Sequence, residues 1–223
     1  MNRRTLLIGA SALGVAAFAG GAVYVNRQRA AEAQAAAAEV AAAPPTEASL
    51  LIRTHSPVLG PADAKVTLVE FFDPSCEACR AFHPVIEALR KEFPTQLRVV
   101  LRYTPFHQGS DEAVRILEAA RRQDKFEQVM NALFEKQPEW AVEGSPDLDK
   151  AWRIAGAAGM DLVKGKADRL FPGTTAVLNQ DVADLQALGV DSTPTFYLEG
   201  RKLLNVTFET LQADIRAAVA AAP

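Results

Sequence analysis

The chain contains only two cysteines, Cys76 and Cys79, which lie three residues apart at the border between two patterned segments. The run before them, residues 66–72, is rich in β-branched and aromatic side chains and predicts a buried strand. Apolar residues after them recur at helical spacing as far as Phe93, which predicts an amphipathic helix that starts at Cys76. A cysteine pair at a strand-to-helix junction indicates an α/β fold.

The short spacing also restricts what the two cysteines can do. A disulfide across so short a loop removes little entropy from the unfolded chain, so a purely structural bridge is a poor interpretation. Structural zinc sites use four ligands, often two such pairs, and no second pair exists in the sequence. Redox chemistry is the interpretation that remains. The helix N-terminus would stabilise a thiolate at Cys76, which predicts Cys76 as the exposed nucleophile and Cys79 as its more buried resolving partner.

The first 25 residues predict an export signal, because Arg3-Arg4 precede a long apolar stretch. The arginine pair is compatible with the twin-arginine route as well as the ordinary secretory route. Cleavage after Ala17-Phe18-Ala19 and retention as an inner-membrane anchor both stay open. Residues 26–50 are Ala-rich and are expected to form a linker or stalk. Either outcome predicts a periplasmic protein in an oxidising compartment, where such a pair can act on disulfides.

The remaining segments predict one domain over residues 51–223. A second strand is expected at 97–103, a helical block at about 109–188, a hairpin at 195–198 and 202–206, and a last helix at 209–220. A right-handed strand–helix–strand crossover makes the first two strands parallel, and the hairpin adds antiparallel strands. We therefore expect a mixed central sheet flanked by helices, with an inserted helical subdomain. The net charge of −3 and the lack of a basic cluster in this part argue against nucleic-acid binding.

The run Glu70-Phe71-Phe72-Asp73-Pro74-Ser75-Cys76-Glu77-Ala78-Cys79, with Pro84 and Thr193-Pro194, resembles the DsbA-like branch of the thioredoxin superfamily. The resemblance implies a thioredoxin fold and a thiol–disulfide oxidoreductase that acts on exported proteins. It implies no dissociable cofactor beyond the Cys76–Cys79 disulfide, and a membrane redox partner that recycles this pair.

The resemblance also assigns residues around the pair. It implies that Pro194 is cis and lies against the cysteines, and that Thr193 offers backbone groups to an extended substrate. Glu70 matches the family's buried acid, which accepts the proton of Cys79. The alternative for Glu70 is a carboxylate at a strand end that faces solvent.

Three residues near Cys76 are expected to tune its thiolate: Asp73, Glu77 and Ala78. The strongly oxidising relatives resemble one another in having a His between the cysteines, where this chain has Glu77-Ala78. Negative charge from Glu77 and Asp73 near the helix N-terminus is expected to raise the pKa of Cys76 by about 0.2–0.7. This predicts a moderately oxidising disulfide, and leaves oxidation, isomerisation and reduction of substrates open.

Two other classes of function stay open beside the enzyme. Cys76, Cys79 and His83 have the spacing of a copper or zinc site, and the chain would then be a metal-handling module. A redox-inert domain that binds partners near Pro194 is the third. His107 is expected in an ordinary loop, and no metal is required by the leading interpretation.

Overall fold

The computed structural model describes residues 27–28 and 47–222. The predicted signal or anchor at 1–25 and most of the predicted linker lie outside these residues. Within the described part, no helix is both long and apolar enough to cross a membrane. The folded part begins with α2 (Glu47–Leu51), a few residues before the predicted boundary at 51, because Leu50 and Leu51 are buried.

A five-stranded sheet with the order β1-β3-β2-β4-β5 forms the centre of the domain. Its strands are β1 (Val58–Leu59), β2 (Val66–Phe72), β3 (Leu97–Tyr103), β4 (Thr195–Leu198) and β5 (Arg201–Lys202). β2 and β3 are parallel and all other neighbours are antiparallel, so the predicted mixed sheet is confirmed. The two-residue β1 was not predicted, since it is too short to show an alternating pattern. β5 ends at Lys202, before the predicted Val206, and Asn205 has a φ of 50°, which an extended strand cannot adopt.

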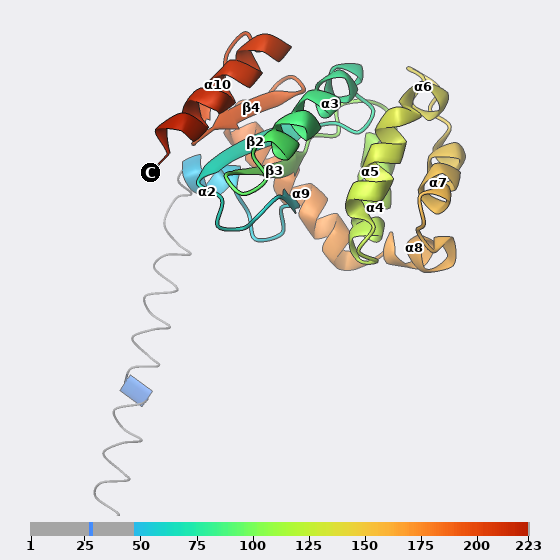
Figure 1. The fold of residues 1–223 in the computed structure, drawn as a ribbon. Coiled ribbons are helices and arrows are strands. Elements are labelled where there is room, and N and C mark those ends of the chain that lie inside the picture. The colour runs from blue at the N-terminus through green and yellow to red at the C-terminus, as the bar shows by residue number, and fades with distance from the viewer. Residues whose placement is uncertain (1–26, 29–46, 223) are drawn as a thin grey trace, which may run out of the picture. The chain divides into compact units, whose positions relative to one another are not determined.

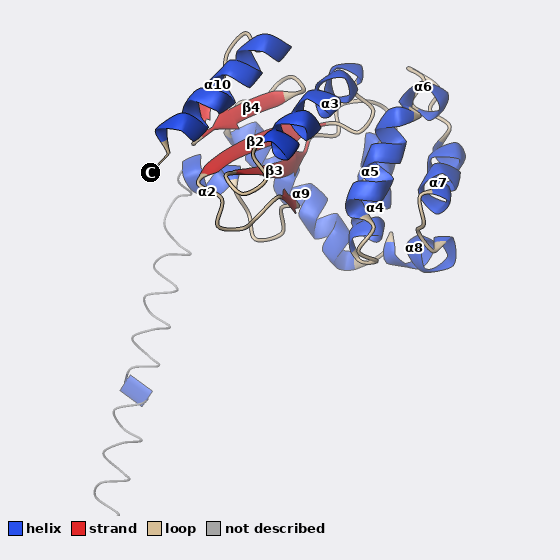
Figure 2. Cartoon of the chain, in the orientation of Figure 1, coloured by secondary structure: helices blue, strands red, loops and turns tan. Residues whose placement is uncertain are grey.

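Helices cover both faces of the sheet (Figure 1, Figure 2). One face carries α3 (Glu77–Glu92) and α10 (Phe208–Ala221), and the other carries α2 and α9 (Pro172–Ala187). Side chains of a strand alternate between faces. Leu68 and Phe72 of β2 therefore pack in the larger core beneath α3 and α10, whereas Val69 and Phe71 pack with α9. Glu70 has the same parity as Leu68 and Phe72, so the sheet directs it toward α3.

The helical insertion lies between β3 and β4, as predicted for about 109–188. It consists of α4 (Ser110–Arg121), α5 (Phe126–Glu135), α6 (Gln137–Trp140), α7 (Leu148–Ala157), α8 (Leu162–Asp168) and the start of α9. Trp140 and Trp152 are buried in it, and their indole N–H groups donate to the Leu133 carbonyl and to Glu112. Both tryptophans therefore serve the core of the insertion.

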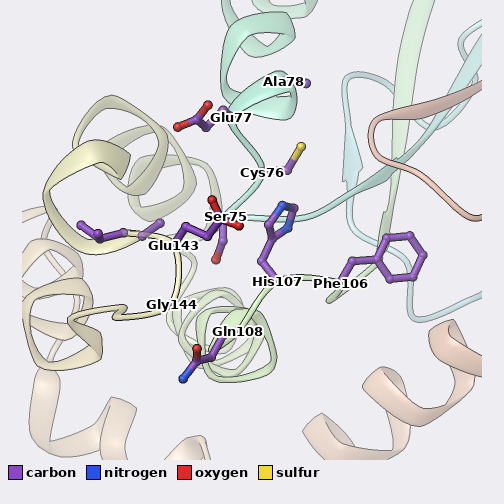
Figure 3. Close-up of a pocket in the computed structure, with 11 residues that line it drawn as sticks. Ser75, Cys76, Glu77, Ala78, Phe106, His107, Gln108, Glu143 and Gly144 are labelled. Carbon is purple, nitrogen blue, oxygen red and sulfur yellow. The ribbon is translucent and has the colours of Figure 1, made fainter.

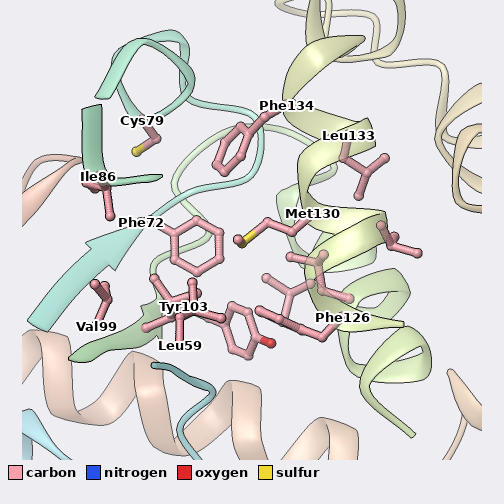
Figure 4. Close-up of a cluster of buried hydrophobic side chains, with 14 of the residues drawn as sticks. Leu59, Phe72, Cys79, Ile86, Val99, Tyr103, Phe126, Met130, Leu133 and Phe134 are labelled. Carbon is pink, nitrogen blue, oxygen red and sulfur yellow. The ribbon is translucent and has the colours of Figure 1, made fainter. Parts of the chain in front are cut away.

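One continuous apolar core joins the insertion to the sheet (Figure 4). The Phe72 ring at the end of β2 contacts the rings of Tyr103 and Phe134, with centroid distances of 5.6 and 6.1 Å. Met130 of α5 packs in the same cluster, and the Tyr103 hydroxyl donates to Glu118 of α4 at 2.7 Å. Because Phe72 directly precedes the turn that leads to the cysteines, this core holds the insertion beside that turn.

The opposite face of the sheet contains a buried cluster of charged groups. Arg102 of β3 is 0% exposed and donates to Asp181 and Asp184 of α9 at 2.6–3.1 Å, and also to the Leu50 carbonyl. Arg53 binds Asp184 with two of its nitrogens, at 2.6 and 2.7 Å. These hydrogen bonds and ion pairs connect α2, β3 and α9. No sequence pattern predicted the cluster.

Candidate active site

The two cysteines occupy the first turn of α3, as predicted. Cys76 is the residue that caps the N-terminus of the helix, with φ −75° and ψ 124°, and Cys79 lies one turn further on. Both thiols are free. Cys79 is 0% exposed and Cys76 is 6% exposed, so the predicted order of burial holds, and Cys76 lines a groove.

The surroundings of the two cysteines shift the pKa values of their thiols in opposite directions. The pKa of Cys76 is lowered to about 5, first of all by a hydrogen bond from the Cys79 thiol, against an opposing effect of burial. The Thr193 side chain and the backbone N–H groups of Cys79 and Ala78 lower it further. Burial, the hydrogen bond to Cys76 and the charge of Glu70 raise the pKa of Cys79 well above its ordinary value. The pair therefore holds one thiolate and one thiol at neutral pH.

The two carboxylates that were expected to raise the pKa of Cys76 are not among the groups that shift it most. Glu77 is exposed and lines the groove together with Ala78. Asp73 is 0% exposed and has a structural role that was not predicted. It accepts hydrogen bonds from the Ser75 N–H at 2.8 Å and the Ser110 hydroxyl at 2.5 Å, and thereby shapes the turn that leads into α3.

Glu70 is buried beneath the cysteines rather than facing solvent, which decides between the two predicted positions. It is 5% exposed, and its pKa is raised to about 8, first by burial and then by the negative charge of Cys76. Its own charge contributes to the raised pKa of Cys79. A carboxyl group with a pKa near neutrality beside a buried thiol can accept or donate a proton there.

Two further side chains hold the active-site turn, and neither was assigned a role from the sequence. Gln137 of α6 is 2% exposed, and its Nε2 donates to the carbonyls of Pro74 and Cys76, both at 2.9 Å. Its Oε1 accepts from Arg80 Nε at 3.0 Å. His107, in the loop after β3, lies with Nδ1 2.8 Å from Asp73 Oδ2. Gln137 lies 61 residues from Cys76, and no local pattern marks such a contact.

Two grooves lie beside the start of α3 and share Ala78 in their linings. The first has a volume of about 600 Å³ and contains Cys76, Glu77 and His107 among its lining residues (Figure 3). The second has a volume of about 450 Å³ and runs along Pro194 and Phe82. The Thr193–Pro194 peptide bond is cis, and the Cys76 thiol can donate to the Thr193 carbonyl, with a sulfur–oxygen distance of 3.4 Å. The loop with the proline thus borders the sulfur of Cys76.

The structure does not assemble the alternative metal site. The His83 ring packs on Phe134 with a centroid distance of 4.9 Å, and its Nε2 lies 2.8 Å from Asn131 Oδ1. Among the residues that the structure describes, no group of three or more His, Cys, Asp or Glu side chains is placed to hold a metal ion. His83 therefore does not join Cys76 and Cys79 as a third ligand.

Known proteins share this fold and, in part, this sequence. A family model described as thioredoxin matches residues 53–217. A thioredoxin-like oxidoreductase from Silicibacter pomeroyi DSS-3 is 33% identical, with a TM-score of 0.68 and coverage of 80% of this chain and 100% of that one. Alpha-DsbA1 of Wolbachia pipientis has a TM-score of 0.67 at 16% identity, over 79% of this chain and 96% of that one, and so shares the fold.

A curated relative is much longer than this chain. The Na(+)/H(+) antiporter NhaA of Herminiimonas arsenicoxydans is 34% identical over 146 residues, which are 66% of this chain and 22% of the antiporter. The chain thus spans about a quarter of the length of the curated relatives that it matches, and the transport in their name belongs to those longer proteins. The family match extends over most of the folded part and agrees with the sheet order and the cysteine helix. The chain therefore belongs to the thioredoxin family and has the DsbA-like form of its fold, with a helical insertion between β3 and β4.

Proposed function

We propose that this protein is a thiol–disulfide oxidoreductase that exchanges disulfides with exported proteins through Cys76 and Cys79. The observation that carries the proposal is the opposite perturbation of the two sulfurs, with the pKa of Cys76 lowered to about 5 and that of Cys79 raised. A stable thiolate is a good leaving group in disulfide exchange, and a buried thiol is kept from reacting until the mixed disulfide has formed.

In the oxidising direction, a substrate thiolate attacks Cys76 Sγ and the Cys76–Cys79 bond breaks. Cys79 leaves with the electron pair and takes a proton from the Glu70 carboxyl group. A second substrate thiolate then attacks the substrate sulfur of the mixed disulfide, and Cys76 leaves as a thiolate. In the reducing direction the steps run backwards, and the Glu70 carboxylate accepts the proton of Cys79 before Cys79 attacks.

The substrate would bind as an extended segment beside the loop that contains Thr193 and Pro194. Both residues are half-buried; one groove contains Cys76 and the other contains Pro194, and both offer room for a peptide chain. Pairing of a substrate strand with backbone groups of Thr193 gives affinity without dependence on side chains. This binding mode would suit an enzyme that acts on many exported proteins.

The direction of electron flow follows from the reduction potential. A Cys76 pKa of about 5 lies between the values of about 7 for thioredoxin and about 3.5 for DsbA, which supports a moderately oxidising pair. Equilibration with glutathione measures it directly. A potential above about −180 mV would indicate an oxidase or isomerase, and one below about −230 mV would indicate a reductase. We expect the periplasm as its compartment and a membrane redox partner that recycles the pair.

Trapping of the mixed disulfide tests the function. In a Cys79→Ser variant, the Cys76 thiolate attacks a substrate disulfide, one substrate sulfur leaves as a thiolate, and the adduct at Cys76 persists. The matched Cys76→Ser variant should form no adduct, because the remaining Cys79 is buried and protonated. Equal trapping by the two variants would contradict the assigned roles of Cys76 and Cys79. The absence of a Cys76–Cys79 disulfide at every glutathione ratio would leave a redox-inert binding domain as the function.

A further inference from the structure

His107 is the polar side chain of the first groove that the proposed exchange reaction leaves unused. It follows β3 in a loop, and Figure 3 shows its imidazole ring turned toward Cys76. The side chain is 47% exposed, so it belongs to the wall of the groove and not to the core. Its position places a titratable side chain beside Cys76.

Asp73 fixes the orientation of the ring. Its Oδ2 lies 2.8 Å from His107 Nδ1 and also accepts the backbone N–H groups of Phe106 and His107, at 2.8 and 2.9 Å. Asp73 is 0% exposed, and its other oxygen accepts from Ser75 and Ser110, so the carboxylate cannot follow a movement of the ring. Since Nδ1 is engaged with Asp73, the edge of the ring that carries Nε2 is the one available to the groove.

We propose that the His107 imidazolium, held in place by Asp73, is the cationic partner of the Cys76 thiolate and thereby favours the reduced form of the cysteine pair. This inference rests on the proposed function, because it concerns the same redox pair. Opposite charges near one another stabilise both charged forms, and a stabilised thiolate makes the corresponding disulfide more oxidising.

The charges around His107 are consistent with a cation at this position. Burial alone lowers its pKa, but the hydrogen bond and charge of Asp73, with the charges of Cys76 and Glu143, raise it overall above its ordinary 6.5. Glu77 lines the same groove, and none of the described lining residues is Lys or Arg. The imidazolium is thus the cation that faces this groove, and it becomes neutral as the pH rises through its raised pKa.

The coupling between the two groups must be reciprocal. Reduction by two glutathione thiols produces one glutathione disulfide, the Cys79 thiol, the Cys76 thiolate and one released proton. Because reduction creates the thiolate, the pKa of His107 is expected to be higher in the reduced protein than in the oxidised one. The Cys76 pKa must differ by the same amount between the protonated and neutral forms of His107. His107 is not among the largest contributors at Cys76, so we expect a shift of about 0.3–1.

Proton NMR titration of the imidazole resonances in both redox states of the full chain measures this shift. The chain has three histidines, and the resonances that are missing from the His107→Gln spectrum identify His107. His55 contacts Asp181 of α9 and lines neither groove, so its resonances serve as the internal control. The His107 midpoint should move upward on reduction.

The reduction potential gives a second readout that a purely structural role would not change. His107→Gln should lower the equilibrium constant for oxidation of glutathione by the cysteine pair two- to tenfold, which is about 9–30 mV. His55→Gln should leave it unchanged. His107→Lys keeps a positive charge and should recover part of the loss, with a weaker dependence on pH.

An unchanged His107 midpoint between the two redox states, together with an unchanged potential in His107→Gln, would overturn the inference. Those results can be obtained only if the Cys76–Cys79 disulfide forms and equilibrates. A failure of the disulfide to form would therefore refute the proposed function, whereas a normal disulfide without coupling refutes only the role of His107.

Discussion

Replacement of Glu70 by glutamine should make the reduced protein more stable at neutral pH, although a buried residue is changed. Glu70 is 5% exposed, and its pKa is about 8 in the folded protein against 4.5 for the free group. At a pH between these two pKa values, the Glu70 carboxyl group is protonated in the folded state and ionised in the unfolded state. The stability of the folded state therefore falls as the pH rises, and the native carboxyl group destabilises the fold at neutral pH.

The size of this penalty follows from the two pKa values. One unit of pKa difference corresponds to about 1.4 kcal/mol, so ionisation in the unfolded state costs about 3 kcal/mol at about pH 7 and less than about 1 kcal/mol at about pH 5. The amide of the Glu70→Gln variant would not titrate, so the variant should gain about 1.4 kcal/mol over the wild type per pH unit from about pH 5 to 8. A buried amide has its own desolvation cost, but this cost is the same at every pH.

Urea unfolding of the reduced proteins across this pH range measures the difference. The Cys76 thiolate acts in the opposite direction, since its lowered pKa makes stability rise with pH, but it is present in both proteins, so only its coupling to Glu70 remains in the comparison. The matched control is Glu135→Gln, at the exposed end of α5. Its stability should differ from that of the wild type by the same amount at every pH. If the stability of Glu70→Gln also differed from that of the wild type by the same amount at every pH, the argument that Glu70 is buried and uncharged at neutral pH would be refuted.

Three other substitutions test the contacts that support the site. Arg102→Met removes a buried cation that contacts two buried carboxylates of α9 and should cost about 3–5 kcal/mol in urea unfolding; a loss below about 1 kcal/mol would contradict this. Gln137→Leu frees two buried carbonyl groups at the active-site turn and should cost about 1–3 kcal/mol, with faster alkylation of Cys76. Thr193→Val should raise the pKa of Cys76 above about 5, measured by the ultraviolet absorbance of the thiolate, and an unchanged midpoint would exclude the hydroxyl as a contributor.

The principal segments around the cysteines could be predicted because each has a local pattern. The β2 run is apolar on both faces except at Thr67 and Glu70, and α3 has a clear apolar stripe, so the strand-to-helix junction follows from residues 66–93 alone. The parallel pairing of β2 and β3 follows from the handedness of the crossover. Short elements were missed, since β1, α2 and α6 are each five residues or fewer and carry no periodic signal.

The sequence by itself determined where the two cysteines lie, the helix that they begin, and the helical block between the second strand and the hairpin. The tertiary structure decided what surrounds them: the turn held by Gln137, the Asp73–His107 pair, the burial of Glu70 and the Arg102 cluster. These groups are polar and often far apart along the chain, so no hydrophobic periodicity marks them. Their hydrogen bonds depend on where packed elements meet, and that is fixed only when the sheet, α3 and the insertion form one core.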